Sequence, residues 1–155
     1  MISIVVGLAG AAALVAGPIM ISRGLAARSS IVKELTKEKI TFPAHEHLPA
    51  ALARYAETQV RTGNQARAFS DLIAVHVAQA TGGRSYSEVN SEWLAGGRKD
   101  EQLGRLRDIA FMGQSLRSSL LSAYQAWQIS ALVIGLGVLF VTIGLGFLTL
   151  AINLR

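Results

Sequence analysis

Two stretches of the chain are apolar and contain no charged side chain. Residues 1–22 read MISIVVGLAGAAALVAGPIMIS, and a helix of that length spans roughly 30 Å, the thickness of a hydrocarbon core. Residues 129–154 form the second stretch, and Tyr124 and Trp127 precede it, where amphipathic rings favour the headgroup level. The pattern predicts transmembrane helices over residues 1–22 and 129–154, with Arg155 reaching the far interface.

A cleaved secretory signal is the main alternative for residues 1–22. Such a signal carries Lys or Arg before its apolar run and small residues at the cleavage site. Residues 1–3 are uncharged here, and the alanines at 11–13 lie in the middle of the run, so a retained helix is favoured. Buried helices of a soluble protein are disfavoured, because a domain this small cannot cover two such helices on all sides.

Small residues recur at every seventh position in both predicted spans. In lipid, small residues let helix backbones approach closely, and a seven-residue period favours left-handed packing. We therefore expect the spans to pair along these stripes, with positions 10 and 137 close enough to crosslink; chance spacing of glycine, common in membrane helices, is the alternative. The stripes are Ser3, Gly10, Gly17 and Gly24 in the first span and Ser130, Gly137, Gly144 and Ala151 in the second.

Residues 23–128, between the spans, are predicted to be mostly helical and to lie outside the membrane. Helices are expected over about 23–40, 48–60, 66–81 and 101–128, and residues 84–100 read as a loop with one turn near Trp93. The last helix is expected to continue into the second span along a coiled-coil seam. That seam is Leu106, Ile109, Gly113, Leu116, Leu120, Ala123 and Trp127. The predicted fold class is an all-α membrane protein, a transmembrane hairpin with long extramembrane extensions and a small helical cap.

Composition narrows the class of protein. The chain is 51% hydrophobic and 16% charged, against about 25% charged in an ordinary soluble domain, which excludes a disordered chain and a plain soluble globule. The absence of cysteine excludes a disulfide scaffold, a thiolate metal site and a lipoprotein anchor. Apart from Arg155, every charged residue lies between Arg23 and Arg117. The positive-inside rule therefore favours a cytoplasmic middle region with both termini outside, although the rule weakens for loops beyond about 60 residues.

Basic residues just after the first span are candidates for contact with anionic lipid headgroups. Arg23, Arg28 and Lys33 occupy this position, and each is worth about 1 kcal/mol of attraction near an anionic leaflet. Ordinary topology also accounts for them. The net charge of +5 does not indicate nucleic-acid binding, because acidic residues interleave the basic ones and no binding motif is present.

Candidate catalytic or metal-binding chemistry is confined to His45-Glu46-His47. In an extended segment, residues two apart point the same way, so both imidazoles could meet one ion. A metal site needs a third and usually a fourth ligand, and a solvated turn explains the cluster equally well. No phosphate-loop or nucleophile-elbow pattern occurs. The sequence thus predicts no catalytic residue, metal or cofactor.

Three short stretches carry a resemblance to a known family. Residues 38–43 read EKITFP, residues 79–88 read QATGGRSYSE, and residues 116–120 read LRSSL. Together they resemble a family of small two-span actinobacterial membrane proteins of unknown function, although Thr62-Gly63-Asn64 stands where that family has Gly-Pro. Members often carry the label of aromatic ring-opening dioxygenase, a chemistry that needs iron ligands in a closed pocket. The resemblance implies the bacterial cytoplasmic (inner) membrane and transfers no catalytic residue.

The leading functional hypothesis is a non-catalytic accessory or assembly subunit that binds other integral membrane proteins in a larger inner-membrane complex, with a respiratory assembly as the first candidate. The alternative is a membrane-bound enzyme or metal-binding protein using His45, Glu46 and His47. A homo-oligomeric channel or transporter component is the third hypothesis. It ranks last because neither span contains an ionisable residue, which transport sites usually carry.

Overall fold

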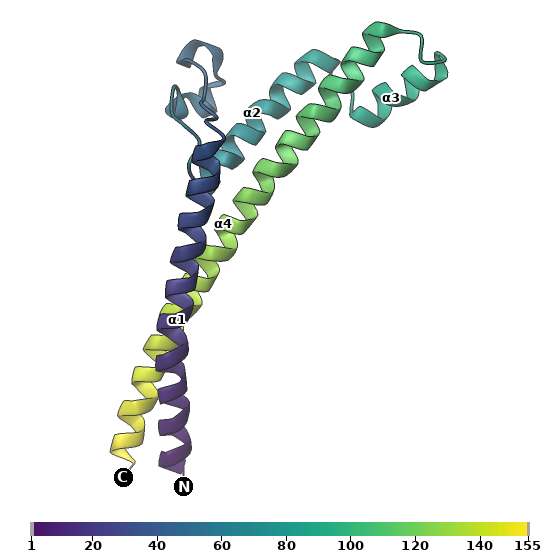
Figure 1. The fold of residues 1–155 in the computed structure, drawn as a ribbon. Helices are drawn as coiled ribbons and strands as arrows, with labels where there is room; N and C mark the ends of the chain where they lie inside the picture. The colour runs from purple at the N-terminus through teal and green to yellow at the C-terminus, as the bar shows by residue number, and fades with distance from the viewer. Residues whose placement is uncertain (1, 155) are drawn as a thin grey trace. The chain divides into compact units, whose positions relative to one another are not determined.

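The computed structural model describes residues 2–154, which form helices and no strand (Figure 1). An isolated β-bridge joins Thr41 to Gln59. The all-helical prediction is confirmed, and Arg155, predicted to reach an interface, lies outside the described residues. The elements in chain order are α1 (Ile2–Lys37), the 3₁₀ helices η1 (His45–His47) and η2 (Ala50–Tyr55), α2 (Gly63–Thr81), α3 (Tyr86–Ala95) and α4 (Glu101–Asn153).

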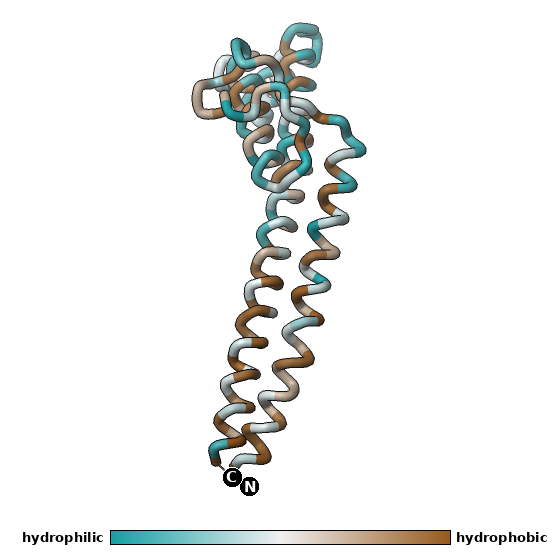
Figure 2. The backbone as a smooth tube through the Cα atoms, turned by 90° about the vertical axis from the view of Figure 1, so that its left-hand side faces the viewer, coloured by the Kyte–Doolittle hydropathy of each residue, from teal (hydrophilic) through white to brown (hydrophobic). Residues whose placement is uncertain are grey.

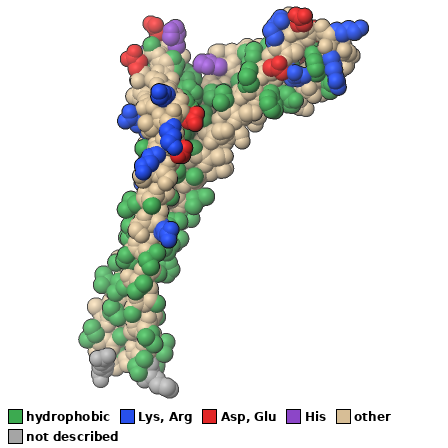
Figure 3. Space-filling view, in the orientation of Figure 1, with side chains coloured by type: hydrophobic (Ala, Val, Ile, Leu, Met, Phe, Trp, Pro, Cys, Tyr) green, Lys and Arg blue, Asp and Glu red, His purple; other side chains and the backbone are tan. Residues whose placement is uncertain are grey.

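The chain divides into two compact units. Unit 1 comprises Met1–Val32 and Ala126–Arg155, and unit 2 comprises Lys33–Gln125. In residues 2–154, α1 and α4 are long and apolar enough to cross a membrane, and their most apolar windows are only 11% buried. Unit 1 is built mainly from apolar residues, as the brown tube of Figure 2 shows, and Figure 3 shows apolar side chains exposed along it.

In unit 1, α1 and α4 run antiparallel and touch along the predicted small-residue stripes. Gly10 lies against Gly144, and Gly17 lies against Gly137. Further along, Gly24 lies against Ser130 and Ile134. Each step of seven residues up α1 therefore matches a step of seven residues down α4. The predicted crosslink between positions 10 and 137 has the wrong register, because Gly137 faces Gly17.

The contact is tight enough to exclude any side chain at its centre. A Cβ atom added to Gly137 would lie 2.7 Å from the Gly17 carbonyl oxygen, and one added to Gly17 would lie 2.7 Å from the Gly137 carbonyl oxygen. Real Cβ atoms do not approach backbone oxygen so closely, so the helices would have to separate. Two other glycines of α4, Gly135 and Gly146, lie in open space, because an added Cβ would meet no neighbouring atom within 4 Å. Packing does not require glycine at either position.

Unit 2 has its core where the segment after α1 folds back onto α2. Phe42 is 2% exposed, stacks on Tyr55 at a centroid distance of 5.2 Å and meets the edge of Phe69 at 5.0 Å. Backbone hydrogen bonds from Phe42 N to Thr58 O and from Val60 N to Ile40 O hold this segment in place. The aromatic cluster and these bonds make a compact core from a short stretch of chain.

Two predicted helices end earlier or change type. The helix expected over 23–40 ends at Lys37, and the positive φ of Lys39, 53°, turns the chain toward the β-bridge. The helix expected over 48–60 is shorter than predicted and is not an α-helix. Only the 3₁₀ helix η2 forms there. Glu57, with a φ of 55°, reverses the chain, and residues 58–60 are then extended and pair with the segment after α1.

The loop expected over residues 84–100 is also wrong, because α3 forms within it. Ser85 caps α3: its side chain accepts a hydrogen bond from Glu88 N, and the Glu88 carboxylate accepts from Ser85 N at 2.7 Å. Val89 is fully buried and anchors the helix on unit 2. This reciprocal cap was legible in the sequence as Ser-x-x-Glu.

The coiled-coil seam predicted for residues 106–127 is half right. Gly113 and Leu120 are buried as expected, but Ile109 and Leu116 are 38% and 56% exposed. Ala110, which is 2% exposed, takes the inward position beside Ile109. The physical reason is the partner: α4 packs here against α2, where the Val77 side chain contacts the position of a Gly113 Cβ, and small residues permit that approach.

Cysteines at positions 7 and 151 test the register of unit 1. An added Gly7 Cβ lies 3.6 Å from the Ala151 Cβ, within the disulfide range of about 3.5–4.5 Å, so Gly7→Cys with Ala151→Cys should form a disulfide on oxidation. Adding Gly137→Leu and Gly144→Leu should lower its yield about tenfold or more, because overpacking costs about 1–3 kcal/mol per site. Non-reducing electrophoresis measures the yield.

The matched control is Gly135→Leu with Gly146→Leu, which adds the same side chains to the same helix where space is open. It should leave the disulfide intact. Equal loss with both pairs of leucines would contradict glycine-mediated packing.

Candidate functional site

The predicted metal-binding alternative falls on an exposed turn. His45, Glu46 and His47 form η1, and with three residues per turn the two imidazoles do not point the same way as they would in a strand. The His47 and Glu46 side chains are 70% and 78% exposed, with His47 Nε2 3.5 Å from Glu46 Oε1. Within residues 2–154, no group of three or more His, Cys, Asp or Glu side chains is placed to hold a metal ion.

Of the three predicted headgroup-binding residues, Arg28 differs from the others. Its Nε donates to Ser130 Oγ at 3.2 Å, and its guanidinium lies 4.7 Å from the Trp127 ring centroid. Ser130 Oγ donates in turn to Trp127 O at 2.6 Å. Arg23 and Lys33 are exposed. Arg28 therefore links α1 to α4 and keeps only part of its hydrogen-bonding capacity for lipid.

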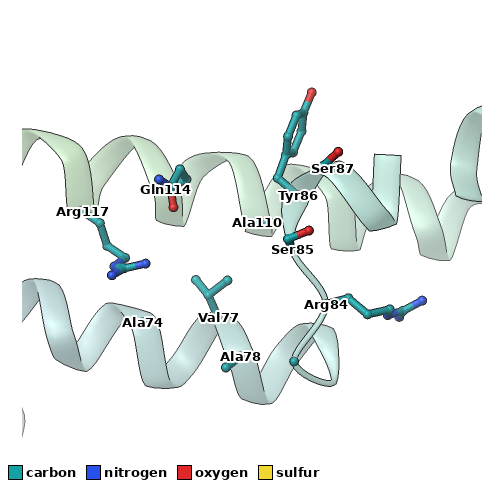
Figure 4. Close-up of a pocket in the computed structure, with 11 residues that line it drawn as sticks. Ala74, Val77, Ala78, Arg84, Ser85, Tyr86, Ser87, Ala110, Gln114 and Arg117 are labelled. Atoms are coloured by element: carbon teal, nitrogen blue, oxygen red, sulfur yellow. The ribbon is translucent and has the colours of Figure 1, made fainter. Parts of the chain in front are cut away.

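The feature most suggestive of ligand binding is a cavity of about 390 Å³ in unit 2. It opens between α2, the start of α3 and α4 (Figure 4). Its lining combines small apolar side chains with a few polar ones and includes no Asp or Glu. The lining residues are Ala74, Val77, Ala78, Gly83, Arg84, Ser85, Tyr86, Ser87, Ala110, Gln114 and Arg117.

Arg117 is the unpaired cation of this cavity. Its side chain extends from α4 toward α2 in Figure 4, and its Nε is buried without a hydrogen-bond partner in residues 2–154. A buried donor without a partner costs about 1–3 kcal/mol. Arg84, the other arginine of the lining, extends away from the cavity; its Nη1 pairs with Glu92 at 2.6 Å and its Nε donates to Thr81 O at 2.9 Å. Arg117 alone thus offers an unneutralised charge.

The first turn of α3 forms one wall of the cavity and is already occupied by a carboxylate. Hydrogen bonds from the Ser85 backbone N–H and hydroxyl hold the pKa of Glu88 below its ordinary value, and the nearby Arg84 adds to this shift. The negative charge of Glu88 satisfies the positive end of the α3 dipole. Arg117 therefore remains the main attraction for an anion.

Neither Arg117 nor the cavity is predicted from the sequence, where Arg117 only marks the end of the charged region and residues 84–100 read as a loop. Two signals could have found the site. The Ser85-x-x-Glu88 capping box predicts α3, and a seam with Ala110 and Arg117 in place of Ile109 and Leu116 places Arg117 inward between Gly113 and Leu120.

Comparison with known proteins adds no relative: no protein-family model, curated protein or solved structure matches the chain. The family resemblance of the three short motifs stays a prediction.

The Glu88 cap predicts a pH dependence for α3. Because the folded-state pKa of Glu88 is lowered, its stabilisation of α3 is complete above the ordinary glutamate pKa and is lost as the pH falls through the lowered value. Ser85→Ala should raise the Glu88 pKa part of the way back, since the backbone donor remains. A ¹³C NMR titration of the Glu88 carboxyl measures this.

Ser91→Ala is the control for that titration, because Ser91 is exposed on the same helix and should leave the Glu88 pKa unchanged. A Glu88 carboxyl that titrates at its ordinary value in the wild-type protein would contradict the cap.

Proposed function

We propose that the protein is a non-catalytic integral membrane protein that acts by binding other membrane proteins, as an accessory or assembly subunit of a larger complex. A respiratory assembly of the inner membrane is the first candidate complex. One observation carries the proposal: large apolar side chains are exposed on the part of α4 that lies among charged residues.

That exposed apolar stripe consists of Ile109, Met112 and Leu116. Their spacing of three and four residues puts them on one face of α4, and they are 38%, 56% and 56% exposed. Single exposed apolar residues are ordinary, but a contiguous patch is typical of an interaction site. The stripe lies beside the face of α4 that packs on α2, so α2 leaves it uncovered.

The proposed spans also leave surfaces available to a partner. Gly135 and Gly146 of α4 have open space around them, unlike the glycines that contact α1. In lipid, helix association depends on close packing at small residues. These two glycines would allow a further helix to approach α4 closely, consistent with a partner in the membrane.

The proposal includes a topology. Residues 1–22 and 129–154 would form a transmembrane hairpin, with residues 23–128 in the cytoplasm as a small helical cap and both termini outside. The excess of basic residues next to the spans supports this orientation. Arg23 and Lys33, both exposed, would meet anionic headgroups.

Photocrosslinking from position 112 tests the proposal. p-Benzoylphenylalanine at Met112 should give a discrete adduct with another membrane protein in native membranes, because this side chain belongs to the exposed apolar stripe. The control position is Ser118, exposed and about 200° around the helix from Leu116; it should give no such adduct.

Met112→Glu with Leu116→Glu should remove the partner from material purified in mild detergent, whereas Ser118→Glu should retain it. A lone monodisperse monomer, with no adduct at position 112, would contradict the proposal. Adducts between two copies of the chain would instead support the homo-oligomeric hypothesis and overturn a heterologous partner.

A further inference from the structure

We propose that the cavity between α2, α3 and α4 binds a small organic anion. Its charged group, a carboxylate or a phosphate, would pair with the Arg117 guanidinium. Its apolar body would lie against Ala74, Val77 and Ala78. This inference goes beyond the proposed docking function and does not depend on it.

The charge of the cavity specifies the sign of the ligand. Within residues 2–154, Arg117 has no counter-ion, the lining contains no carboxylate, and Arg84 is already neutralised by Glu92. A guanidinium carries five N–H donors in a planar fork that matches a carboxylate or phosphate. Arg117 lines the cavity and its Nε is buried without a partner, so the terminal N–H groups of the guanidinium are the donors that such a group would meet.

The rest of the lining specifies the body of the ligand. The apolar part of the lining comes mainly from Ala74, Val77 and Ala78 of α2, and the polar part includes Ser85, Ser87 and Gln114. The volume of about 390 Å³ falls within the range of about 300–1,000 Å³ that is usual for small-molecule sites. A mixed lining with one unneutralised cation favours an anion with one charged group and a compact, partly apolar body.

A second cavity of unit 2 shows why an arginine in a cavity is not sufficient. That cavity, of about 280 Å³, is lined by Arg67 and Asp71 among others. The Arg67 Nε lies 3.3 Å from an Asp71 oxygen, so its charge is neutralised within the cavity itself. Arg117 lacks such a neighbour, and the anion is inferred for its cavity alone.

Ligand-observed ¹⁹F NMR tests the inference on the full chain in phosphatidylcholine nanodiscs. The probes are 4-fluorobenzoate, 4-fluorophenyl phosphate and the neutral 4-fluorobenzamide. At least one anion should bind more tightly than the amide. Arg117→Gln should weaken that binding about tenfold or more, because a charge-assisted hydrogen bond is lost. Binding of only the benzoate or only the phosphate identifies which anionic group the site takes, and either supports the inference.

Two further variants separate a binding defect from misfolding. Ala78→Leu should exclude all three probes by filling the cavity while leaving Arg117 in place. Arg105→Gln changes an exposed arginine of the same helix and should bind like the wild type. Circular dichroism and the Glu88 pKa report whether each variant is folded. Equal binding of the amide and the anions, unchanged binding by folded Arg117→Gln, or no binding of any probe would each overturn the inference.

Discussion

The backbone contact between α1 and α4 is the constraint on which unit 1 depends. In the proposed membrane location, burying apolar surface would give no net drive for helix association, so the helices would depend on close van der Waals contact. The mutual approach of Gly17 and Gly137 to each other's carbonyl oxygens provides that contact. A side chain at either position would push the helices apart, and the rest of the two small-residue stripes would then lose contact with each other.

The same contact explains why polar groups occur at one end of the helix pair. Ser130 continues the small-residue stripe of α4, and its size lets α1 come near enough for Arg28 to reach it. Trp127, one turn earlier, offers its ring face to the same guanidinium. A larger residue at position 130 would remove both the hydrogen bond and the space for the arginine. The stripe thus sets the position of Arg28, a cation for which the sequence alone predicts lipid contact or ordinary topology.

The sequence predicts the contacts of unit 1 better than those of unit 2, for a physical reason. Where two apolar helices pack, the positions of the small residues largely determine the contact. The seven-residue period of Gly10, Gly17 and Gly24 therefore predicts the packing face directly. In unit 2 the buried face depends on which element supplies the partner. Ala110 is buried and Ile109 exposed because α2 needs a close approach, and nothing local to residues 106–127 identifies α2. The prediction for the segment around η2 is inaccurate for the same reason, because residues 58–60 pair with residues 40–42, a contact between segments distant in the sequence.

Which face of α4 packs on α2 decides whether Arg117 lies in solvent or between the helices. With Leu116 inward, Arg117 would face solvent as one more surface charge. With Ala110 and Gly113 inward, Arg117 falls in line with Leu120 on the face toward α2, and its Nε is buried. A helix that needed only to pack on α2 would be better served there by an aliphatic side chain, since an unpaired buried donor opposes folding. An arginine facing a cavity whose lining contains no acidic side chain is therefore unfavourable for the fold alone, and the proposed anion would offset this cost by neutralising the guanidinium.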